Sequence, residues 1–150
     1  MQAHEIMIHN VYKVKEDDKV RAVIEKFINH RISGLPVVND RNEIVGYISD
    51  GDIMRYIGKK NDRVVDFFYF ATIISDTEAL ESKISRILEL PVMNIAKKKV
   101  TTCLWDEEID RVANILGQRQ IKKLPVERNG VLAGIISRGD VIRHVFKMFS

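Results

Sequence analysis

An internal repeat is the feature of this sequence that most limits how the chain can fold. Asp18–Val38 matches Glu107–Glu127 at a constant offset of 89 residues, and Gly46–Asp52 then matches Gly134–Asp140 at an offset of 88. Such a repeat indicates one supersecondary unit written twice. A lone unit of roughly 50–60 residues buries so little surface that it would be only marginally stable by itself. We therefore expect the two copies to pack on each other or on a second chain.

Each copy has the same predicted order of elements, β-α-β-β-α. Val20, Val23 and Phe27 fall at helical spacing in the first copy. In the second copy, Asn129-Gly130 is a dipeptide typical of a tight β-hairpin. The order predicts an α/β (α+β) fold in which two such motifs pack as a pseudo-twofold pair. The expected strands are Val11–Val14, Leu35–Val38 and Ile44–Ile48, then Val100–Cys103, Leu124–Glu127 and Val131–Ile136, and the closing helices begin near Ile53 and Val141.

The residues between the copies form an insert that is too apolar to be a flexible linker. It contains an aromatic run, Phe67–Phe70, and a predicted helix, Thr77–Leu90, with Ser75 and Glu78 as a candidate capping box. We expect the insert to pack on its own pair of copies rather than on a partner. The predicted organisation is a first motif at 1–57, a helical insert at 58–91 and a second motif at 92–150.

Cysteine usage and hydropathy indicate the environment. Cys103 is the single cysteine, which excludes an intramolecular disulfide and a zinc site of several thiolates. The longest apolar run, Phe67–Ile74, is far shorter than the roughly 20 residues of a membrane helix. The sequence therefore predicts a soluble, cytoplasmic protein in a reducing compartment.

Both copies place a Ser-x-Gly-Asp sequence where a strand ends and a helix begins, at Ser49–Asp52 and Ser137–Asp140. Free backbone N–H groups at a helix start attract phosphate, and an aspartate can accept hydrogen bonds from both hydroxyls of a ribose. The same residue types are ordinary helix caps, and caps duplicate together with the modules. Two interpretations therefore stand at each corner, half of a nucleotide site and a cap.

The doubled pattern resembles the CBS-domain family in its tandem form, the Bateman module. Ile-x-x-Leu-Pro-Val occurs at Ile32–Val37 and Ile121–Val126, and each copy continues with a hairpin and Gly-φ-Ile-Ser-x-x-Asp, where φ is apolar. The resemblance covers nearly the whole chain except Gly58–Leu90.

The resemblance implies a non-catalytic sensor that binds adenosyl ligands, such as AMP, ADP, ATP or S-adenosylmethionine, in clefts between the motifs. It implies that Asp52 and Asp140 hold ribose hydroxyls, while Ser49 and Ser137 contact phosphate. The residues implied to wall the adenine or to line the cleft are Ile32, Leu35, Pro36, Ile121, Leu124 and Pro125, together with Met7, Ile8, Ala96 and Lys97.

Charge distinguishes the two copies. Residues 1–94 carry 13 Lys/Arg and 15 Asp/Glu, whereas residues 95–150 carry 11 and 6. Asp50 follows Ser49, but Arg138 follows Ser137, and guanidinium–phosphate bonds are strong. The lysines at 97–99 and 122–123 also belong to the second copy in sequence. We therefore predict that a phosphorylated adenosine prefers the Ser137–Asp140 corner, with Arg138 as a contact.

No sequence pattern indicates catalysis, because nucleophile–base pairs, paired acids and metal-ligand spacings are all missing. We predict a protein that is not an enzyme, needs no obligatory cofactor, forms a homodimer and signals to a protein target. The alternative is a structural dimerisation module with empty clefts, in which the Phe67–Phe70 region is the contact surface. Nucleic-acid binding through the basic C-terminal half is less favoured, because no recognition helix or aromatic interleaving accompanies the lysines.

Overall fold

The computed structural model describes residues 1–58, 79–118 and 121–150. The first part of the chain forms α1 (Ala3–Ile6), β1 (Val14–Lys15), α2 (Val20–His30), β2 (Gly34–Val38), β3 (Ile44–Ser49) and α3 (Asp50–Gly58). The remainder forms α6 (Leu80–Leu88), the 3-10 turn η1 (Val92–Asn94), β4 (Cys103–Leu104), α7 (Ile109–Gln118), β5 (Lys123–Arg128), β6 (Val131–Ser137) and α8 (Arg138–Lys147).

The predicted β-α-β-β-α order is confirmed in both copies. The leading strands are shorter than expected and begin three residues later, at Val14 and Cys103. The helical turns α1 and η1 were not predicted, because three or four residues are too few to show an apolar period. The aromatic run Phe67–Phe70 and the capping pair Ser75 and Glu78 lie outside the described residues.

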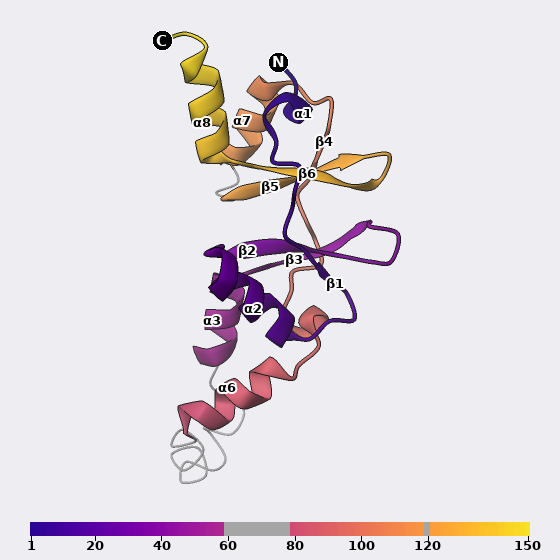
Figure 1. Cartoon of the computed structure of the whole chain (residues 1–150), viewed down its shortest axis with the longest axis vertical. Coiled ribbons are helices and arrows are strands. Elements are labelled where there is room, and N and C mark those ends of the chain that lie inside the picture. The colour runs from indigo at the N-terminus through magenta and orange to yellow at the C-terminus, as the bar shows by residue number, and fades with distance from the viewer. Residues whose placement is uncertain (59–78, 119–120) are drawn as a thin grey trace.

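The structure has two three-stranded sheets, β1-β2-β3 and β4-β5-β6. They lie face to face between two layers of helices (Figure 1). In each sheet the leading strand runs parallel to the central strand, which pairs antiparallel with the last one. The antiparallel ladders shift register at matching places, after Val37 and after Val126. All five residues of β2 are buried, as expected for a strand covered by helices on one face and by a second sheet on the other.

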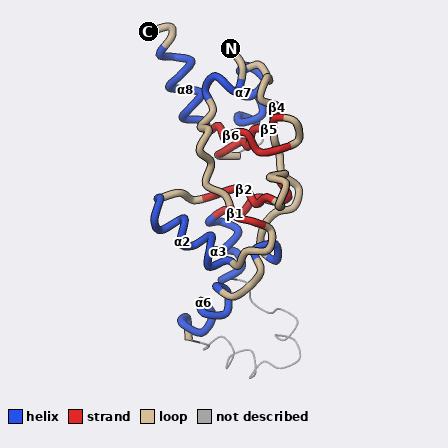
Figure 2. The backbone as a smooth tube through the Cα atoms, turned by 45° about the vertical axis from the view of Figure 1, so that its right-hand side comes forward, coloured by secondary structure: helices blue, strands red, loops and turns tan. Residues whose placement is uncertain are grey.

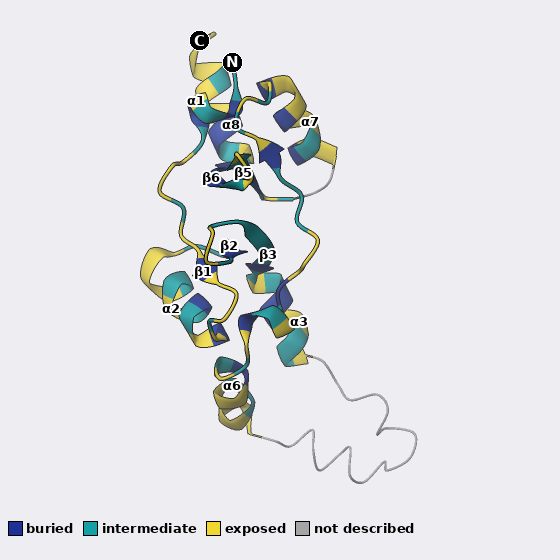
Figure 3. Cartoon of the chain, turned by 90° about the vertical axis from the view of Figure 1, so that its right-hand side faces the viewer, coloured by how far each residue is buried: buried dark blue, intermediate teal, exposed yellow. Residues whose placement is uncertain are grey.

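The two copies exchange their leading segments. Ala3 and Ile6 of α1 are buried in the core of the second copy, against the side chains that α7 and β6 contribute. Reciprocally, Val92 and Ala96 are buried in the core of the first copy, with Val20. Two connections therefore run between the halves (Figures 2 and 3), and both termini lie at the outer end of the second copy (Figure 1). Each copy therefore has a helix-side core, the one between its helices and its sheet, and neither of these cores is complete without residues from the other repeat.

Paired backbone hydrogen bonds hold each exchanged segment on the last strand of the other copy. Ile8 and Ile135 exchange N–H···O bonds of 2.9 and 3.0 Å, and Lys97 and Tyr47 exchange two of 2.9 Å. Glycine lies beside each crossing: a Cβ on Gly46 would stand 3.2 Å from the Lys97 carbonyl oxygen. The two crossings are therefore equivalent. At each one the backbone of the exchanged segment lies close to the last strand, which explains the glycine at this place, Gly46 or Gly134.

The described part of the insert packs on the first copy. Ile87 of α6 is buried with the side chains of α2, and the backbone N–H of Val20 donates to the Leu90 carbonyl at 2.9 Å. The Glu89 carboxylate accepts hydrogen bonds from Lys19 Nζ at 2.7 Å and Arg21 Nη2 at 2.6 Å. These two bonds lower the pKa of Glu89 to about 2. The end of the insert is thus attached to α2 by apolar packing, main-chain bonds and ion pairs.

A substitution at the second crossing tests this arrangement. A Cβ on Gly134 would meet Met7 Sδ and would stand 3.0 Å from the Ile8 carbonyl oxygen. We expect Gly134→Ala to lower the free energy of unfolding by about 1–3 kcal/mol, because crowding at a packed site forces backbone or side chains to shift. Urea titration measures the change.

Gly117 provides the matched control, because a Cβ there meets nothing within 4 Å and the residue lies in α7. Gly117→Ala should stabilise the protein by about 0.4–1 kcal/mol through the reduced entropy of the unfolded chain. Equal urea midpoints for both variants would contradict the close crossing at Gly134.

Candidate functional site

A cavity of about 480 Å³ lies between the copies, at the start of α3. The first copy lines it with Ser33, Gly34, Tyr47, Arg55 and the turn at 49–52. The second copy lines it with Lys97, Pro125 and the residues at 99–101 and 121–123. Because both repeats contribute walls, a ligand in this cavity would contact both halves of the molecule.

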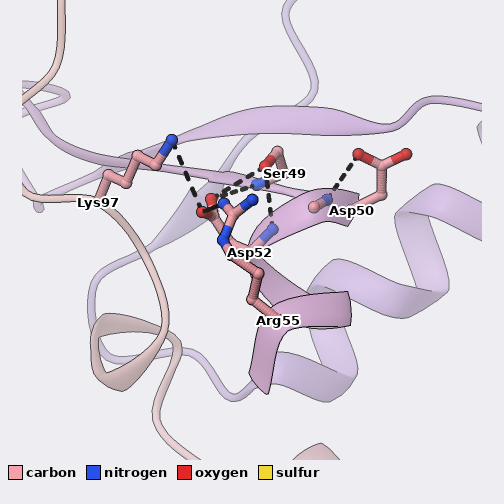
Figure 4. Close-up of polar contacts among 6 residues, drawn as sticks. Ser49, Asp50, Asp52, Arg55 and Lys97 are labelled. Carbon is pink, nitrogen blue, oxygen red and sulfur yellow. Dashed lines mark hydrogen bonds and ion pairs between the residues drawn. The ribbon is translucent and has the colours of Figure 1, made fainter. Parts of the chain in front are cut away.

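Asp52 is the most enclosed polar group of the cavity, with 8% of its surface exposed. Its Oδ2 accepts hydrogen bonds from the backbone N–H and the hydroxyl of Ser49, both at 3.0 Å. Its Oδ1 accepts one from Arg55 Nη2 at 2.6 Å and lies 3.8 Å from Lys97 Nζ. Figure 4 shows Lys97 and Arg55 converging on this carboxylate. Asp52 therefore caps α3 and also presents a paired carboxylate at the cavity.

Two neighbours of Asp52 shape the rest of this wall. The Asp50 carboxylate accepts a hydrogen bond from the Gly51 N–H at 2.7 Å and points away from Lys97 (Figure 4). Burial raises the pKa of Tyr47 to about 12, and the negative charges of Asp50 and Asp52 make smaller contributions in the same direction. The Tyr47 phenol is therefore neutral at physiological pH and provides a hydroxyl that can donate or accept a hydrogen bond.

The second corner repeats the internal geometry of the first. Asp140 accepts a hydrogen bond from the Ser137 N–H at 2.8 Å and one from Arg143 Nη2 at 3.1 Å, and its own N–H donates to Ser137 Oγ at 3.1 Å. These bonds form a capping box for α8. Asp140 is 5% exposed and does not line the cavity. Arg138 turns to α7 instead, where its Nε donates to the Leu116 carbonyl at 3.0 Å.

The exchanged segments make the two corners chemically different. Lys97 pairs with Tyr47 beside the first corner, and Ile8 pairs with Ile135 at the equivalent place beside the second. The second corner thus has an apolar side chain where the first has a cation. Further along that segment, the ring of Tyr12 stacks on His30 at 3.9 Å.

The assignment of the lysines to the Ser137–Asp140 corner is wrong. The cavity beside Ser49 and Asp52 of the first copy is lined by Lys97, Lys99, Lys122 and Lys123. The physical reason is that the leading segment of the second copy pairs with β3, while the start of β5 faces the first sheet. The second copy does carry the excess of lysines in the sequence, but in the folded protein these lysines lie at the Ser49–Asp52 corner of the first copy.

The structure brings some of the predicted wall residues to the cavity and leaves others in the cores. Ile121 and Pro125 line it. The side chains of Leu35 and Leu124 are 1% and 0% exposed and belong to the helix-side cores, so they cannot form its wall. Strand alternation explains this, because each leucine and the following proline point to opposite faces of the sheet.

The remaining predicted wall residues also lie elsewhere. Ile32 packs against the first core, Met7 packs against the second, and the buried Ala96 belongs to the first. Pro36 is buried opposite Tyr47 in the sheet register and is not part of the lining. Ile8, which pairs with Ile135 of β6, is 49% exposed.

Sequence reasoning missed Arg55 and Tyr47. The signal for Arg55 is an Asp-x-x-Arg spacing that occurs in both copies, at Asp52–Arg55 and at Asp140–Arg143, and that places the two side chains on one helix face. Tyr47 has no such signal, because its contact with the cavity depends on the packing of the two sheets.

Other kinds of site have little support among the described residues. No group of three or more His, Cys, Asp or Glu side chains in residues 1–58, 79–118 and 121–150 is placed to hold a metal ion. Burial raises the pKa of the Cys103 thiol to about 12, which suppresses its thiolate. No helix within these ranges is long and apolar enough to cross a membrane.

Comparison with known proteins gives a consistent result. The family model described as the CBS domain matches residues 3–59 and 92–147. Protein MJ1426 of Methanocaldococcus jannaschii is 32% identical over 139 residues, which span 86% of this chain and 82% of that protein. The chloroplastic CBS domain-containing protein CBSX2 of Arabidopsis thaliana is 25% identical over 138 residues, which span 89% of this chain and 58% of that protein. The crystal structure of CBSX2 in complex with AMP has a TM-score of 0.74 at 22% identity and covers 99% of this chain and 98% of the solved one.

The shifted pKa of Tyr47 predicts a pH dependence of stability. Between about pH 10, the ordinary tyrosine value, and about pH 12, the folded protein keeps the phenol proton that the unfolded chain has lost. The contribution of Tyr47 is therefore complete below pH 10 and is lost as the pH rises toward 12. Urea unfolding of wild type and Tyr47→Phe over this range should show a steeper fall for wild type. Parallel curves would contradict the assignment.

Proposed function

We propose that this chain, which belongs to the CBS domain family, is a non-catalytic module that binds an adenosine nucleotide in the cavity at the start of α3. The observation that carries the proposal is the Asp52 carboxylate, held at a helix start on the wall of a cavity that both repeats line. The Oδ1 atom of that carboxylate is not used by the cap and can accept hydrogen bonds from ribose hydroxyls. The AMP in the crystal structure of CBSX2 supports this choice of ligand.

The groups around Asp52 suit the other parts of a nucleotide. The N–H groups at the start of α3 are already hydrogen-bonded, to the Ser33 carbonyl, Asp50 Oδ1 and Ser49 Oγ, so in this proposal the phosphate pairs with the lysines of the facing wall. Ile121 and Pro125 provide apolar surface for the adenine. In this proposal the ribose hydroxyls take over acceptor capacity that Arg55 and Lys97 share in the present structure.

Transmission of occupancy follows from the position of the cavity. A ligand can shift a conformational equilibrium only by the difference in its affinity for the two states. Because the cavity walls come from both copies, their relative position affects every contact that the ligand makes. We propose that occupancy biases this relative position and that a protein target responds to it.

A homodimer is the second part of the proposal. Met54 of α3 and Ile142 of α8 occupy matching positions of the repeat, and they are 65% and 56% exposed. Phe146 and Phe149, near the end of the chain, are 63% and 84% exposed. Figure 3 shows exposed residues on the outer part of α8. We propose that these exposed apolar groups on the two halves form one surface that a second copy covers. The same observation supports the alternative of a purely structural dimerisation module.

Substitution of the two aspartates tests the choice of site. Asp52→Ala should weaken binding of ATP at least about tenfold, because the ribose loses its acceptor, whereas Asp140→Ala should leave the affinity within about twofold. Calorimetric titration of both variants measures this. Both variants lose a helix cap, worth about 1 kcal/mol, so loss of stability alone is matched between them. Equal loss of affinity from both would overturn the assignment.

A thermal-shift screen with adenosine, AMP, ADP, ATP and S-adenosylmethionine separates the sensor from the structural module. A ligand that binds only the folded protein raises its melting temperature. We expect an upward shift that Asp52→Ala removes. If none of these compounds raises the melting temperature of the wild-type protein, the structural dimerisation module is the better description.

Ile142→Glu tests the dimer surface. A carboxylate placed in an apolar interface is desolvated, so we expect at least about a tenfold weaker dimer, which is about 1.4 kcal/mol. Sedimentation equilibrium measures the change. Leu104→Glu is the control, because Leu104 is 54% exposed and lies on β4 rather than on α3 or α8. A monomer in the wild-type protein, or equal weakening by both substitutions, would count against this surface.

A further inference from the structure

We infer that the cavity selects a nucleotide with a polyphosphate chain over a nucleoside monophosphate and over S-adenosylmethionine. The inference rests on the proposed function, in which an adenosine ligand occupies this cavity. It goes further because it states what distinguishes one adenosine ligand from another. The observation that carries it is the set of cationic side chains that the second copy places opposite the Ser49–Asp52 corner.

The cavity has an excess of positive charge. Five of its lining side chains are cationic and two are carboxylates, which leaves an excess of three. The cations are Arg55, Lys97, Lys99, Lys122 and Lys123, and the carboxylates are Asp50 and Asp52. An enclosed surface with one sign of charge concentrates ligands of the opposite sign.

Three of the lysines have no counterion among the residues that the structure describes. Arg55 and Lys97 both lie at the Asp52 carboxylate, and together with Asp50 these four lining side chains have no net charge. Lys99, Lys122 and Lys123 form no ion pair with any residue in the described ranges. Their charges are therefore available to a ligand, and they come from two separate segments of the second copy that both line this cavity.

The free lysines discriminate between adenosine ligands by charge. A single phosphate can pair with only part of this set of three lysines. Additional phosphates extend the negative charge of the ligand and can reach the lysines of the facing wall, where each close ion pair adds affinity. S-adenosylmethionine has a sulfonium cation in place of phosphate, and its ammonium and carboxylate groups cancel, so its net charge is positive and the same lysines disfavour it.

The experiment is calorimetric titration of the full chain with ATP, AMP, adenosine, S-adenosylmethionine and inorganic tripolyphosphate. We expect ATP to bind at least about tenfold more tightly than AMP and to lose this advantage as salt is raised, since screening weakens ion pairs. The double variant Lys99→Gln/Lys122→Gln should lower the affinity for ATP about tenfold and leave that for adenosine unchanged. Lys123 is left intact because it lies half-buried in β5.

Lys98→Gln is the matched control, because Lys98 is an exposed neighbour that does not line the cavity. It removes one charge at nearly the same place in sequence and should leave the ATP affinity unchanged. An equal effect of Lys98→Gln and of the double variant would show a general charge effect and would overturn the inference.

The remaining outcomes separate this inference from the proposed function. If adenosine and AMP bind in an Asp52-dependent way but ATP binds no more tightly than AMP, the polyphosphate selectivity is overturned and the nucleotide site stands. If tripolyphosphate binds but adenosine does not, the lysines form an anion site and the proposed nucleotide function is overturned. If no adenosine compound binds, both are overturned.

Discussion

The reciprocal exchange of leading segments is the constraint on which the rest of this structure depends. Ala3 and Ile6 complete the core of the second copy, and Val92 and Ala96 complete the core of the first. Each repeat thus buries apolar surface that belongs to the other, so neither half can keep its core if the pair is separated. The paired backbone bonds at Ile8 and at Lys97 set the register of the two crossings. A small module that buries too little surface alone becomes one cooperative unit in this way.

The same exchange explains why the two corners differ although their local geometry is alike. Each Ser-x-Gly-Asp turn forms the same serine–aspartate cap with an arginine three residues later. What lies beside each cap comes from the opposite repeat, and the repeats have diverged there: Lys97 approaches Asp52, whereas Ile8 occupies the equivalent place. A sequence difference in the leading segment of one copy therefore changes the surroundings of the Ser-x-Gly-Asp corner in the other copy.

Capping and ligand binding are compatible at Asp52, because its two oxygens have separate partners. Oδ2 accepts from Ser49 and holds the start of α3, while Oδ1 faces the cations Arg55 and Lys97. A ligand that takes over Oδ1 leaves the cap intact. The sequence leaves open whether Asp52 is a helix cap or a binding residue, and the geometry of this corner is compatible with both roles. At Asp140 the cap is the role that the structure supports.

Local and repeated features of the sequence determined the fold. The helical spacing of Val20, Val23 and Phe27 and the matched Ile-x-x-Leu-Pro-Val segments were sufficient for the order of elements, because these patterns report which face of an element is buried. The Ser-x-Gly-Asp turns were likewise recognisable, since capping is a local interaction. The sequence could not show which copy supplies the cations of the cavity, that Leu35 and Leu124 face the helices, or that Tyr47 lines the site. Those facts depend on contacts between residues far apart in the chain, and only the packing of one sheet on the other, with its exchanged segments, decides them.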